Sequence, residues 1–446
     1  MGSEWTHRTF QQLIDDGSLE VGDGYRAKNS ELGGHGPIFL RAGHVSDTRI
    51  DFEGVERFHA ELADKVQGKM AKLGDTIITT KGNSTGRTSF VTDRLPPFVY
   101  SPHLSYWRSK DLNRIEGGFL RYWSNGHEFV DQLRGMSTST DMAPYLSLTD
   151  QRRLKISLPP IEDQRKIAHV LGTLDDKIEL NRRMNGTLES MARALFQSWF
   201  VDFDPVCAKQ QGRHPPSLDP ATAALFPAEF EPSELGHIPN GWRTGCVRDV
   251  VEGLYDGPHA TPPAAESGAV FLGIKNLAGT RLKLEEIRYI GESDWPRWTK
   301  RVQPRADDIV FSYEAALGLF SLIPPGLRCC LGRRLALLRP NPTSGSRYLL
   351  HWFTSSYFQE LLQARAMLGA TVNRTSLLEF PSYPILLPPE KVVERFERFA
   401  KPIWASIFAN DTESRTLAAL RDALLPRLLS GKLPVPVVEQ IVAEAG

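Results

Sequence analysis

Two long stretches of the chain carry apolar residues at the spacing of a coiled-coil helix. One follows Leu158-Pro159-Pro160 and the other follows Leu387-Pro388-Pro389, and proline suits the first turn of a helix. Apolar residues then recur in steps of three and four, which is the period of a helix–helix seam. The residues expected in this seam are Leu171, Leu174, Ile178, Asn181, Leu188 and Leu195 of the first helix, and Ile403, Ile407, Asn410, Leu417 and Leu424 of the second.

An asparagine interrupts each seam near its middle. Asn181 and Asn410 stand where the period calls for an apolar residue, and they are 229 positions apart. A buried asparagine costs stability but fixes the register, because it requires a partner in one alignment. Our hypothesis is an antiparallel pairing of the helices about a pseudo-twofold axis, with Asn181 and Asn410 close together at the centre. The alternative is that both asparagines face solvent.

The helices belong to an internal repeat, which indicates a duplicated fold. "FLRAGHV" at Phe39–Val45 matches "FLGIKNL" at Phe271–Leu277 with an offset of 232 positions, and at that offset Asp75 falls opposite Asp307. Through the two helices the offset is 229. Each half is therefore a variable globular module followed by a shared helical one.

The predicted fold class is α+β, with two globular domains in tandem that are each followed by one of the long helices. Seven prolines mark the segment between the halves as a linker, because proline removes a backbone donor and interrupts a helix. The expected boundaries are 1–158 for the first globular domain, 159–200 for the first helix, 201–240 for the linker, 241–388 for the second globular domain, 389–431 for the second helix and 432–446 for a C-terminal tail.

The first helix ends in the aromatic residues Phe196, Trp199, Phe200 and Phe203. These side chains carry more apolar surface than one two-helix seam can bury, so they are a candidate docking surface for a partner protein. The alternative is that they pack against the protein's own globular domains.

Composition adds only broad limits. The 446 residues, 41% hydrophobic and 24% charged, are typical of a globular protein with more than one domain. No apolar run of about 18 residues is present, and the N-terminal residues lack a secretion signal, so we expect a cytoplasmic protein without a membrane partner. The spacing of the cysteines predicts neither a metal site nor a disulfide framework.

The charge and motif content favour a binding protein over an enzyme. The net charge is zero, which argues against a nucleic-acid partner, but residues 240–388 hold 17 basic against 13 acidic residues. The chain has no nucleotide-binding loop, no zinc-protease motif and no nucleophilic-serine motif. We therefore expect a non-catalytic protein that binds no metal or cofactor of its own.

Loops of both globular domains contain residue types that bind DNA. Cations pair with phosphates and guanine, while amides and hydroxyls read base edges. Each residue is otherwise explained as part of a solvated surface. The candidates are Lys81, Asn83, Ser84, Thr85 and Arg87 in the first domain, and Lys275, Asn276, Tyr313, Arg328, Arg333, Arg334, Asn373 and Arg374 in the second.

With these features the chain resembles the specificity subunits of type I restriction-modification systems over nearly its whole length. The resemblance rests on "LPPIEDQRKIAHVLGTLDDKIELNRRMNGTLESMARALFQSWFVDFDP" at Leu158–Pro205, on "LGHIPNGW" at Leu235–Trp242 and on "LLPRLLSGKL" at Leu424–Leu433. The second helix start, "LPPEKVVERF", departs from the pattern because it lacks the Glu162-Asp163-Gln164 stretch of the first.

The resemblance implies a non-catalytic subunit whose two target-recognition domains read a bipartite double-stranded DNA sequence. It also implies that the helices dock two modification subunits, which bind S-adenosylmethionine and methylate adenine. Restriction (translocase) subunits would add ATP- and Mg²⁺-dependent translocation and cleavage. The alternative from the residues alone is a non-catalytic tandem-domain scaffold that binds proteins, which would show no salt-dependent affinity for DNA.

Overall fold

The computed structural model of the protein describes residues 5–46, 49–137, 145–215, 217–366 and 373–433. The chain forms two compact units: a first unit of residues 1–179 with 416–446, and a second unit of residues 180–415. The boundary between them falls inside both long helices, so each unit contains one globular part and a part of each helix. Most of the expected tail at 432–446 lies outside the described residues. In the described ranges, no helix has both the length and the apolar character needed to cross a membrane.

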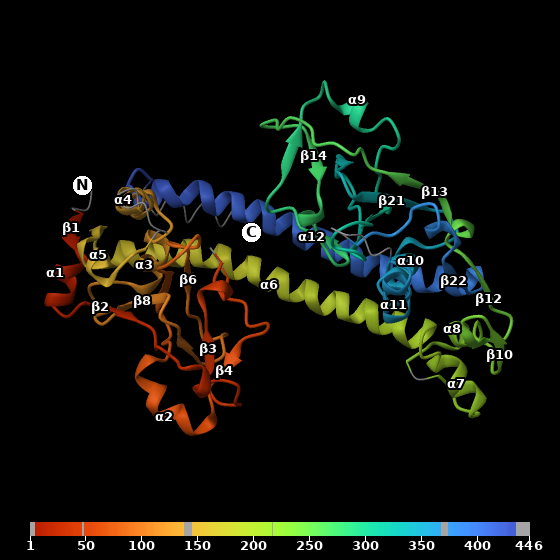
Figure 1. Ribbon diagram of the computed structural model, residues 1–446, viewed down its shortest axis with the longest axis horizontal. Helices are drawn as coiled ribbons and strands as arrows, with labels where there is room; N and C mark the ends of the chain where they lie inside the picture. The colour runs from red at the N-terminus through yellow and green to blue at the C-terminus, as the bar shows by residue number, and fades with distance from the viewer. Residues whose placement is uncertain (1–4, 47–48, 138–144, 216, 367–372, 434–446) are drawn as a thin grey trace. The chain divides into compact units, whose positions relative to one another are not determined.

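The prediction of two long helices is confirmed. Helix α6 spans Ile161–Phe200 and helix α12 spans Glu390–Leu429, so each has 40 residues and they start 229 positions apart (Figure 1). Both begin directly after the second proline of an LPP motif, where a missing backbone N–H is tolerated. At a rise of 1.5 Å per residue, each helix is about 60 Å long.

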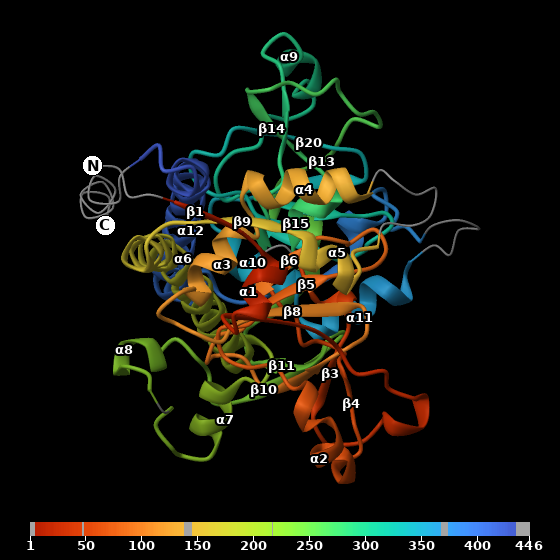
Figure 2. The same ribbon diagram turned by 90° about the vertical axis from the view of Figure 1, so that its left-hand side faces the viewer.

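The two helices pack against each other within both units. In the first unit the early part of α6 shares a core with the late part of α12, and Figure 2 shows the helices adjacent there. In the second unit the late part of α6 shares a core with the early part of α12. This reversed order confirms the predicted antiparallel pairing. The predicted seam residues are Leu171, Leu174, Ile178, Leu417 and Leu424 in the first core, and Leu188, Leu195, Ile403 and Ile407 in the second.

The globular part of the first unit is built on two small sheets. One is antiparallel with the strand order β2-β8-β5-β6, and the other has the order β4-β3-β7 with β3 and β7 parallel. A separate pair, β1 with β9, leads into α6. The elements are β1 Thr6–Thr9, α1 Phe10–Asp15, β2 Leu19–Asp23, β3 Ile38–Leu40, β4 Glu56–Arg57, α2 Ala63–Val66, β5 Thr76–Thr79, β6 Thr88–Phe90, β7 Phe98–Tyr100, β8 Leu104–Ser109, α3 Gly117–Trp123, α4 His127–Ser137, α5 Leu148–Arg153 and β9 Lys155–Leu158.

The globular part of the second unit has the same topology, which confirms the internal repeat. Its sheets have the orders β13-β21-β18-β19 and β17-β14-β20, again with a parallel pair, β14 and β20, and β12 pairs with β22 before α12. The elements are β12 Arg243–Cys246, β13 Val251–Asp256, β14 Ala269–Leu272, β15 Leu277–Ala278, β16 Arg281–Leu282, β17 Arg288–Ile290, α9 Trp295–Trp298, β18 Ile309–Ser312, β19 Phe320–Leu322, β20 Cys329–Leu331, β21 Leu335–Pro340, α10 Ser346–Phe353, α11 Ser356–Ala364 and β22 Pro384–Leu387.

A duplicated buried ion pair corrects one residue match in the repeat. Asp75, next to β5, accepts two hydrogen bonds from the guanidinium of Arg108, at 2.6 and 2.7 Å. Asp308, next to β18, accepts the same two bonds from Arg339, at 3.0 and 2.7 Å. Asp75 therefore corresponds to Asp308 and not to Asp307, because the chain before β18 holds one more residue than the offset of 232 allows.

Polar side chains occupy the middle of the seam, and these contacts lie within the second unit. Asn410 donates from Nδ2 to Oδ1 of Asn185 at 2.9 Å. Asn181 donates to Oγ of Ser414 at 3.3 Å and to the carbonyl oxygen of Asn410 at 3.5 Å. Asn181 and Asn185 are both buried. The two asparagines of the hypothesis therefore lie in contact, but the side chain that Asn410 meets is that of Asn185, one turn further along α6.

The aromatic end of α6 lies in the core of the second unit. Phe196, Trp199 and Phe200 are 2%, 1% and 1% exposed, and the ring centroids of Phe203 and Trp242 are 5.8 Å apart. The prediction that these four residues dock a partner is therefore wrong. The second globular part covers the apolar surface that a two-helix seam leaves open, as the alternative held.

The expected linker at 201–240 is instead a folded part of the second unit. Pro205 and Pro220 stand in first turns of helices, where proline is favoured, so the prolines begin short helices here and do not mark an extended segment. The elements are α7 Asp204–Gln210, α8 Pro220–Ala223, β10 Phe230–Ser233 and β11 Gly236–Pro239, and the buried apolar residues include Val206, Phe226 and Ile238.

The two helix starts differ at one buried position, which accounts for the departure in the second LPP motif. The amide of Gln164 accepts from the N–H of Glu116 at 3.0 Å and donates to the carbonyl oxygen of Arg114 at 3.1 Å. Its counterpart, Val393, packs in the apolar core beside Gly345, where a Cβ would lie 2.7 Å from a valine methyl group. At this matched position the first globular part contacts its helix through hydrogen bonds and the second through apolar packing.

Alanine substitutions test whether Asn185 and Asn410 act as a pair. Each single substitution removes the hydrogen-bond partner of the other amide, buried at Asn185 and half-buried at Asn410, so the two losses in the free energy of unfolding should not add. We expect a coupling energy of about 0.5–3 kcal/mol from a double-mutant cycle measured by urea denaturation. Asn185→Ala combined with Lys401→Ala, an exposed residue of α12, provides the additive control. Additive losses for the asparagine pair would contradict the register role.

Candidate nucleic-acid interface

The candidates of the first unit lie on the loop between β5 and β6. Gly82 and Gly86 have φ angles of +82° and +92°, a conformation that favours glycine and turns the loop back on itself. The hydroxyl of Thr85 donates to the carbonyl oxygen of Gly82 at 2.7 Å, so Thr85 shapes the loop. The other candidates are the exposed Lys81, Asn83 and Arg87 and the half-buried Ser84.

Two further segments border this loop. The N–H of Thr80 donates to the carbonyl oxygen of His103 at 2.9 Å, and the N–H of Leu146 donates to the carbonyl oxygen of Thr80 at 2.9 Å. Lys81 and Tyr145 form a β-bridge. The exposed side chains of His103 and Tyr145 therefore lie on segments bonded to the loop that carries Lys81.

In the second unit the matching loop follows β18 and is bonded in the same way. The N–H of Tyr313 donates to the carbonyl oxygen of Arg334 at 3.2 Å, and the N–H of Thr375 donates to the carbonyl oxygen of Tyr313 at 2.8 Å. Glu314 forms an ion pair with Arg334 at 2.9 Å and a β-bridge with Arg374. The structure thus gathers Tyr313, Arg334, Arg374 and the neighbouring Asn373, which are far apart in the sequence.

The two clusters share one backbone scaffold and differ in their side chains. Both are centred on the end of a central strand, β5 or β18, and each is bordered by the residue before the next long strand and by a segment late in the globular part. The first unit has a lysine, a histidine and a tyrosine at the positions where the second unit has a glutamate and two arginines. The matched positions are Lys81 and Glu314, His103 and Arg334, and Tyr145 and Arg374.

Comparison with known proteins identifies the scaffold. The family model described as "Type I restriction modification DNA specificity domain" matches residues 35–190. The chain is a homologue of type I restriction-modification specificity subunits. It is 25% identical to the HindI specificity subunit of Haemophilus influenzae over 89% of this chain and 94% of that protein. It is 23% identical to the MjaIX specificity subunit of Methanocaldococcus jannaschii over 69% of this chain and 66% of that protein.

A solved structure shows the same fold. The crystal structure of the type I restriction-modification S subunit from M. genitalium has a TM-score of 0.54 with this chain at 12% identity, and the match covers 96% of both chains. The two globular parts are accordingly the tandem recognition domains of a specificity-subunit homologue, and the loop clusters are their candidate DNA-reading surfaces.

Tyr313 is a scaffold residue of the second recognition domain, so its prediction as a DNA contact is corrected. Its side chain is 7% exposed, and its hydroxyl donates to Oδ1 of Asp256 at 2.9 Å. Burial raises the pKa of Tyr313, and the hydrogen bond to the Asp256 carboxylate raises it further. A base could reach this hydroxyl only if the domain opened.

Asn276 is also corrected. It is 2% exposed, its Oδ1 accepts from the N–H of Gly273 at 2.9 Å, and its Nδ2 donates to the carbonyl oxygen of Lys283 at 2.9 Å. The amide is therefore committed to holding its own loop. The neighbouring Lys275 is exposed and pairs with Glu286 at 3.3 Å.

The remaining arginine candidates have different surroundings. The guanidinium of Arg328 lies 4.3 Å from the centroid of the Trp295 ring and donates to Glu292 at 2.6 Å. Arg333 is exposed in the turn between β20 and β21, next to the clustered Arg334. We therefore retain Arg333 as the stronger candidate for reading a base.

Two residues that the sequence did not single out, His259 and Arg301, border the second cluster. Nε2 of His259 lies 2.7 Å from Oδ2 of Asp256, and Arg301 donates to the same oxygen at 3.3 Å. The side chain of Arg301 is 56% exposed, so it can also contact a phosphate. No local signal marks these residues, because only the fold brings them to Tyr313. In the first unit, the repeat register could have identified His103 and Tyr145.

Neither a candidate metal site nor a disulfide is found among the described residues. They contain no group of three or more His, Cys, Asp and Glu side chains that could hold a metal ion. All four cysteines are free thiols, and burial raises the pKa of Cys330 to about 12.

Alanine substitutions at Arg87, Arg333 and Arg301 should separate base reading from phosphate binding. An arginine bidentate to guanine contributes about 1–3 kcal/mol of discrimination, so Arg87→Ala and Arg333→Ala should weaken binding of the specific site by that amount. Arg301→Ala should weaken binding to all sequences and lower the salt slope by about one. Fluorescence anisotropy of the assembled complex at several salt concentrations measures both quantities.

Arg328→Ala is the matched control, because Arg328 is held by Glu292 and Trp295 and its loss should leave the affinity unchanged. Equal affinities of wild type and Arg333→Ala for the specific site would show that the wrong loop was chosen.

Proposed function

We propose that this protein reads a split double-stranded DNA target as the specificity subunit of a cytoplasmic type I restriction-modification complex, with one half-site for each recognition domain. The observation that carries this proposal is the use of one loop scaffold twice with different side chains. Two identical surfaces would read the same half-site twice. The change of side chain at all three matched positions supports two different half-sites.

The two helices would set the distance between the half-sites. Both α6 and α12 pass without a break from one unit into the other, and a helix pair resists bending and stretching. Duplex DNA uses about 3.4 Å of axis per base pair, so a fixed helix pair restricts the number of base pairs between the half-sites. The hydrogen bond between Asn410 and the buried Asn185 supports this role, because it admits one register.

The chain would contribute recognition and no catalysis. In the proposed complex two modification subunits hold S-adenosylmethionine and methylate adenine, and restriction subunits use ATP and Mg²⁺ for translocation and cleavage. The net charge of zero fits a shared interface, because partner subunits can supply part of the contact with the DNA phosphates.

An exposed apolar stripe on α6 is the proposed docking surface for modification subunits, in place of the buried aromatic residues. Leu180, Met184 and Met191 are 47%, 44% and 53% exposed, and their spacing of four and seven residues puts them on one face of the helix. Exposed apolar side chains in a row indicate an interaction surface. Methionine is suited to such a surface because its flexible side chain adapts to a partner.

The first test of the function is the pattern of DNA methylation. Cells that express this chain with its modification subunit should methylate adenine only within a motif of two specific blocks, separated by a fixed number of unspecified base pairs. Sequencing that detects methyladenine measures the motif, and cells with the modification subunit alone are the control. A continuous motif would contradict the two-domain reading, and a lack of methylation would contradict the role in such a complex.

Charged substitutions test the docking surface. Met184→Glu combined with Met191→Glu places two carboxylates in the stripe and should weaken binding of the purified modification subunit by more than about tenfold, or 1.4 kcal/mol. Leu378→Glu is the matched control, because Leu378 is 94% exposed but lies outside the helices. Isothermal titration calorimetry gives both affinities. Unchanged affinity of the double variant would exclude this stripe.

A further inference from the structure

In the second unit, a short hairpin of the recognition domain carries an arginine to both long helices. Strands β15 and β16 are joined by Gly279, whose φ angle is +73°, and Thr280. Arg281 follows this turn. Its Nε contacts the carboxylate of Glu189 on α6, and its NH1 donates to Oδ1 of Asp411 on α12 at 2.8 Å. We call Glu189, Arg281 and Asp411 the second triad.

The second triad is joined to the polar middle of the seam. Oδ1 of Asp411 also accepts from Nδ2 of Asn185 at 2.7 Å, and Asn185 in turn accepts from Asn410. Burial raises the pKa of the Asp411 carboxyl, although the hydrogen bonds from Arg281 and Asn185 oppose this. One guanidinium thus connects the recognition domain to the side chains that fix the helix register.

The same hairpin is fixed to the DNA-reading part of the domain. The hydroxyl of Ser321 on β19 lies 2.8 Å from the carbonyl oxygen of Gly279 and 2.9 Å from that of Arg281. Strand β19 pairs with β18, and the loop between them begins at Tyr313 in the candidate cluster. A shift of the hairpin would therefore shift that loop relative to α6 and α12.

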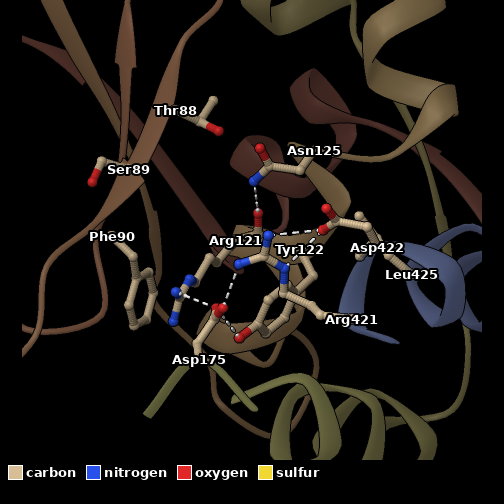
Figure 3. A pocket seen from close by; sticks show the side chains of 10 residues that line it. All are labelled: Thr88, Ser89, Phe90, Arg121, Tyr122, Asn125, Asp175, Arg421, Asp422 and Leu425. Atoms are coloured by element: carbon tan, nitrogen blue, oxygen red, sulfur yellow. Dashed lines mark hydrogen bonds and ion pairs between the residues drawn. The ribbon is translucent and has the colours of Figure 1, made fainter. Parts of the chain in front are cut away.

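The first recognition domain has a comparable contact within the first unit, shown in Figure 3. Asp175 on α6 accepts from Arg121 of α3, from NH1 of Arg421 on α12 at 2.7 Å and from the hydroxyl of Tyr122 at 2.7 Å. We call Arg121, Asp175 and Arg421 the first triad. Asp422 pairs with Arg421 at 2.8 Å, so the charges around the small cavity beside this triad are already balanced and do not indicate a ligand.

The triads are not relics of the duplication, because they occupy positions that do not match in the repeat. At the helix offset of 229, Asp175 corresponds to Trp404 and Arg421 corresponds to Ala192, both of which are buried apolar residues. The order of charges is also reversed. The first triad sets one acid between two arginines, and the second sets one arginine between two acids.

We propose that Arg121 and Arg281 are positioning residues that fix the orientation of each recognition domain on the helix pair, and so select the number of base pairs between the half-sites. This inference rests on the proposed function. An ion pair that is mostly shielded from water adds little net stability compared with apolar packing. The planar guanidinium, however, has a fixed donor geometry that suits orientation. Each triad meets one recognition domain and both helices, which is the arrangement that orientation requires.

The test measures spacing selectivity in the complete complex with modification subunits. Substrates are duplexes that carry the split target, identified for the wild type, at its natural spacing and at one base pair more or fewer. For Arg281→Ala we expect the ratio of methylation rates between the natural and altered spacings to fall about tenfold. Arg281→Lys keeps the positive charge but loses the planar, fixed donor geometry of the guanidinium, so it should lower the ratio by less. Arg121→Ala should lower the ratio in the same way.

Arg305→Ala is the matched control, because Arg305 pairs with Glu252 at 3.0 Å inside the same domain and should keep the wild-type ratio. A purely stabilising role would slow methylation equally at every spacing, and an unchanged ratio for Arg281→Ala would overturn the inference. If that variant does not assemble, Glu189→Gln decides: a lowered ratio supports the inference and an unchanged ratio overturns it. Absence of any split target in the wild type would instead overturn the proposed function.

Discussion

The pairing of α6 with α12 is the interaction on which both recognition domains depend. Each core contains side chains from both helices: Leu171 lies with Leu424 in the first unit, and Phe196 with Phe396 in the second, with ring centroids 6.1 Å apart. Burial of one such side chain contributes about 1.5–3 kcal/mol, and the net stability of a domain is only about 5–15 kcal/mol. A recognition domain therefore cannot complete its core with the helix that follows it in the sequence, and needs the helix of the other repeat.

The seam between α6 and α12 is apolar in the first unit and partly polar in the second, and the two parts have different roles. In the first unit the predicted seam residues are apolar, and they contribute burial without specifying a register. In the second unit Asn181 and Asn185 are buried, and their amide nitrogens donate hydrogen bonds to the opposite helix that only one alignment allows. Polar seam residues reduce stability but exclude alternative registers. The proposed role in setting a distance on DNA requires the second property as much as the first.

The sequence could predict the features that have a local signal, and it failed where distant contacts decide. The LPP motifs and the apolar period of the helices are local, so both starts were predicted. Tyr313 and Asn276 were misassigned because a polar loop residue can either hold the loop or face a ligand. The choice depended on Asp256 and on Lys283. The aromatic end of α6 was wrongly predicted to be a docking surface, because the residues that pack over it, including Trp242, follow the helix in the sequence. The one additional residue before β18 moved the predicted match of Asp75 from Asp308 to Asp307, and no sequence pattern marks this residue.

The duplication kept the scaffold and changed the surfaces that must differ. The loops of the two clusters diverged, as two different half-sites would require, and so did the surfaces of the helices on which the recognition domains pack, here called seats. Arg121 finds the carboxylate of Asp175 on α6, whereas the matching position of α12 is occupied by Trp404. A first recognition domain placed on the second seat would bury Arg121 against an indole without a counter-charge, which is strongly unfavourable. The two seats therefore differ in the charge that they offer to a recognition domain.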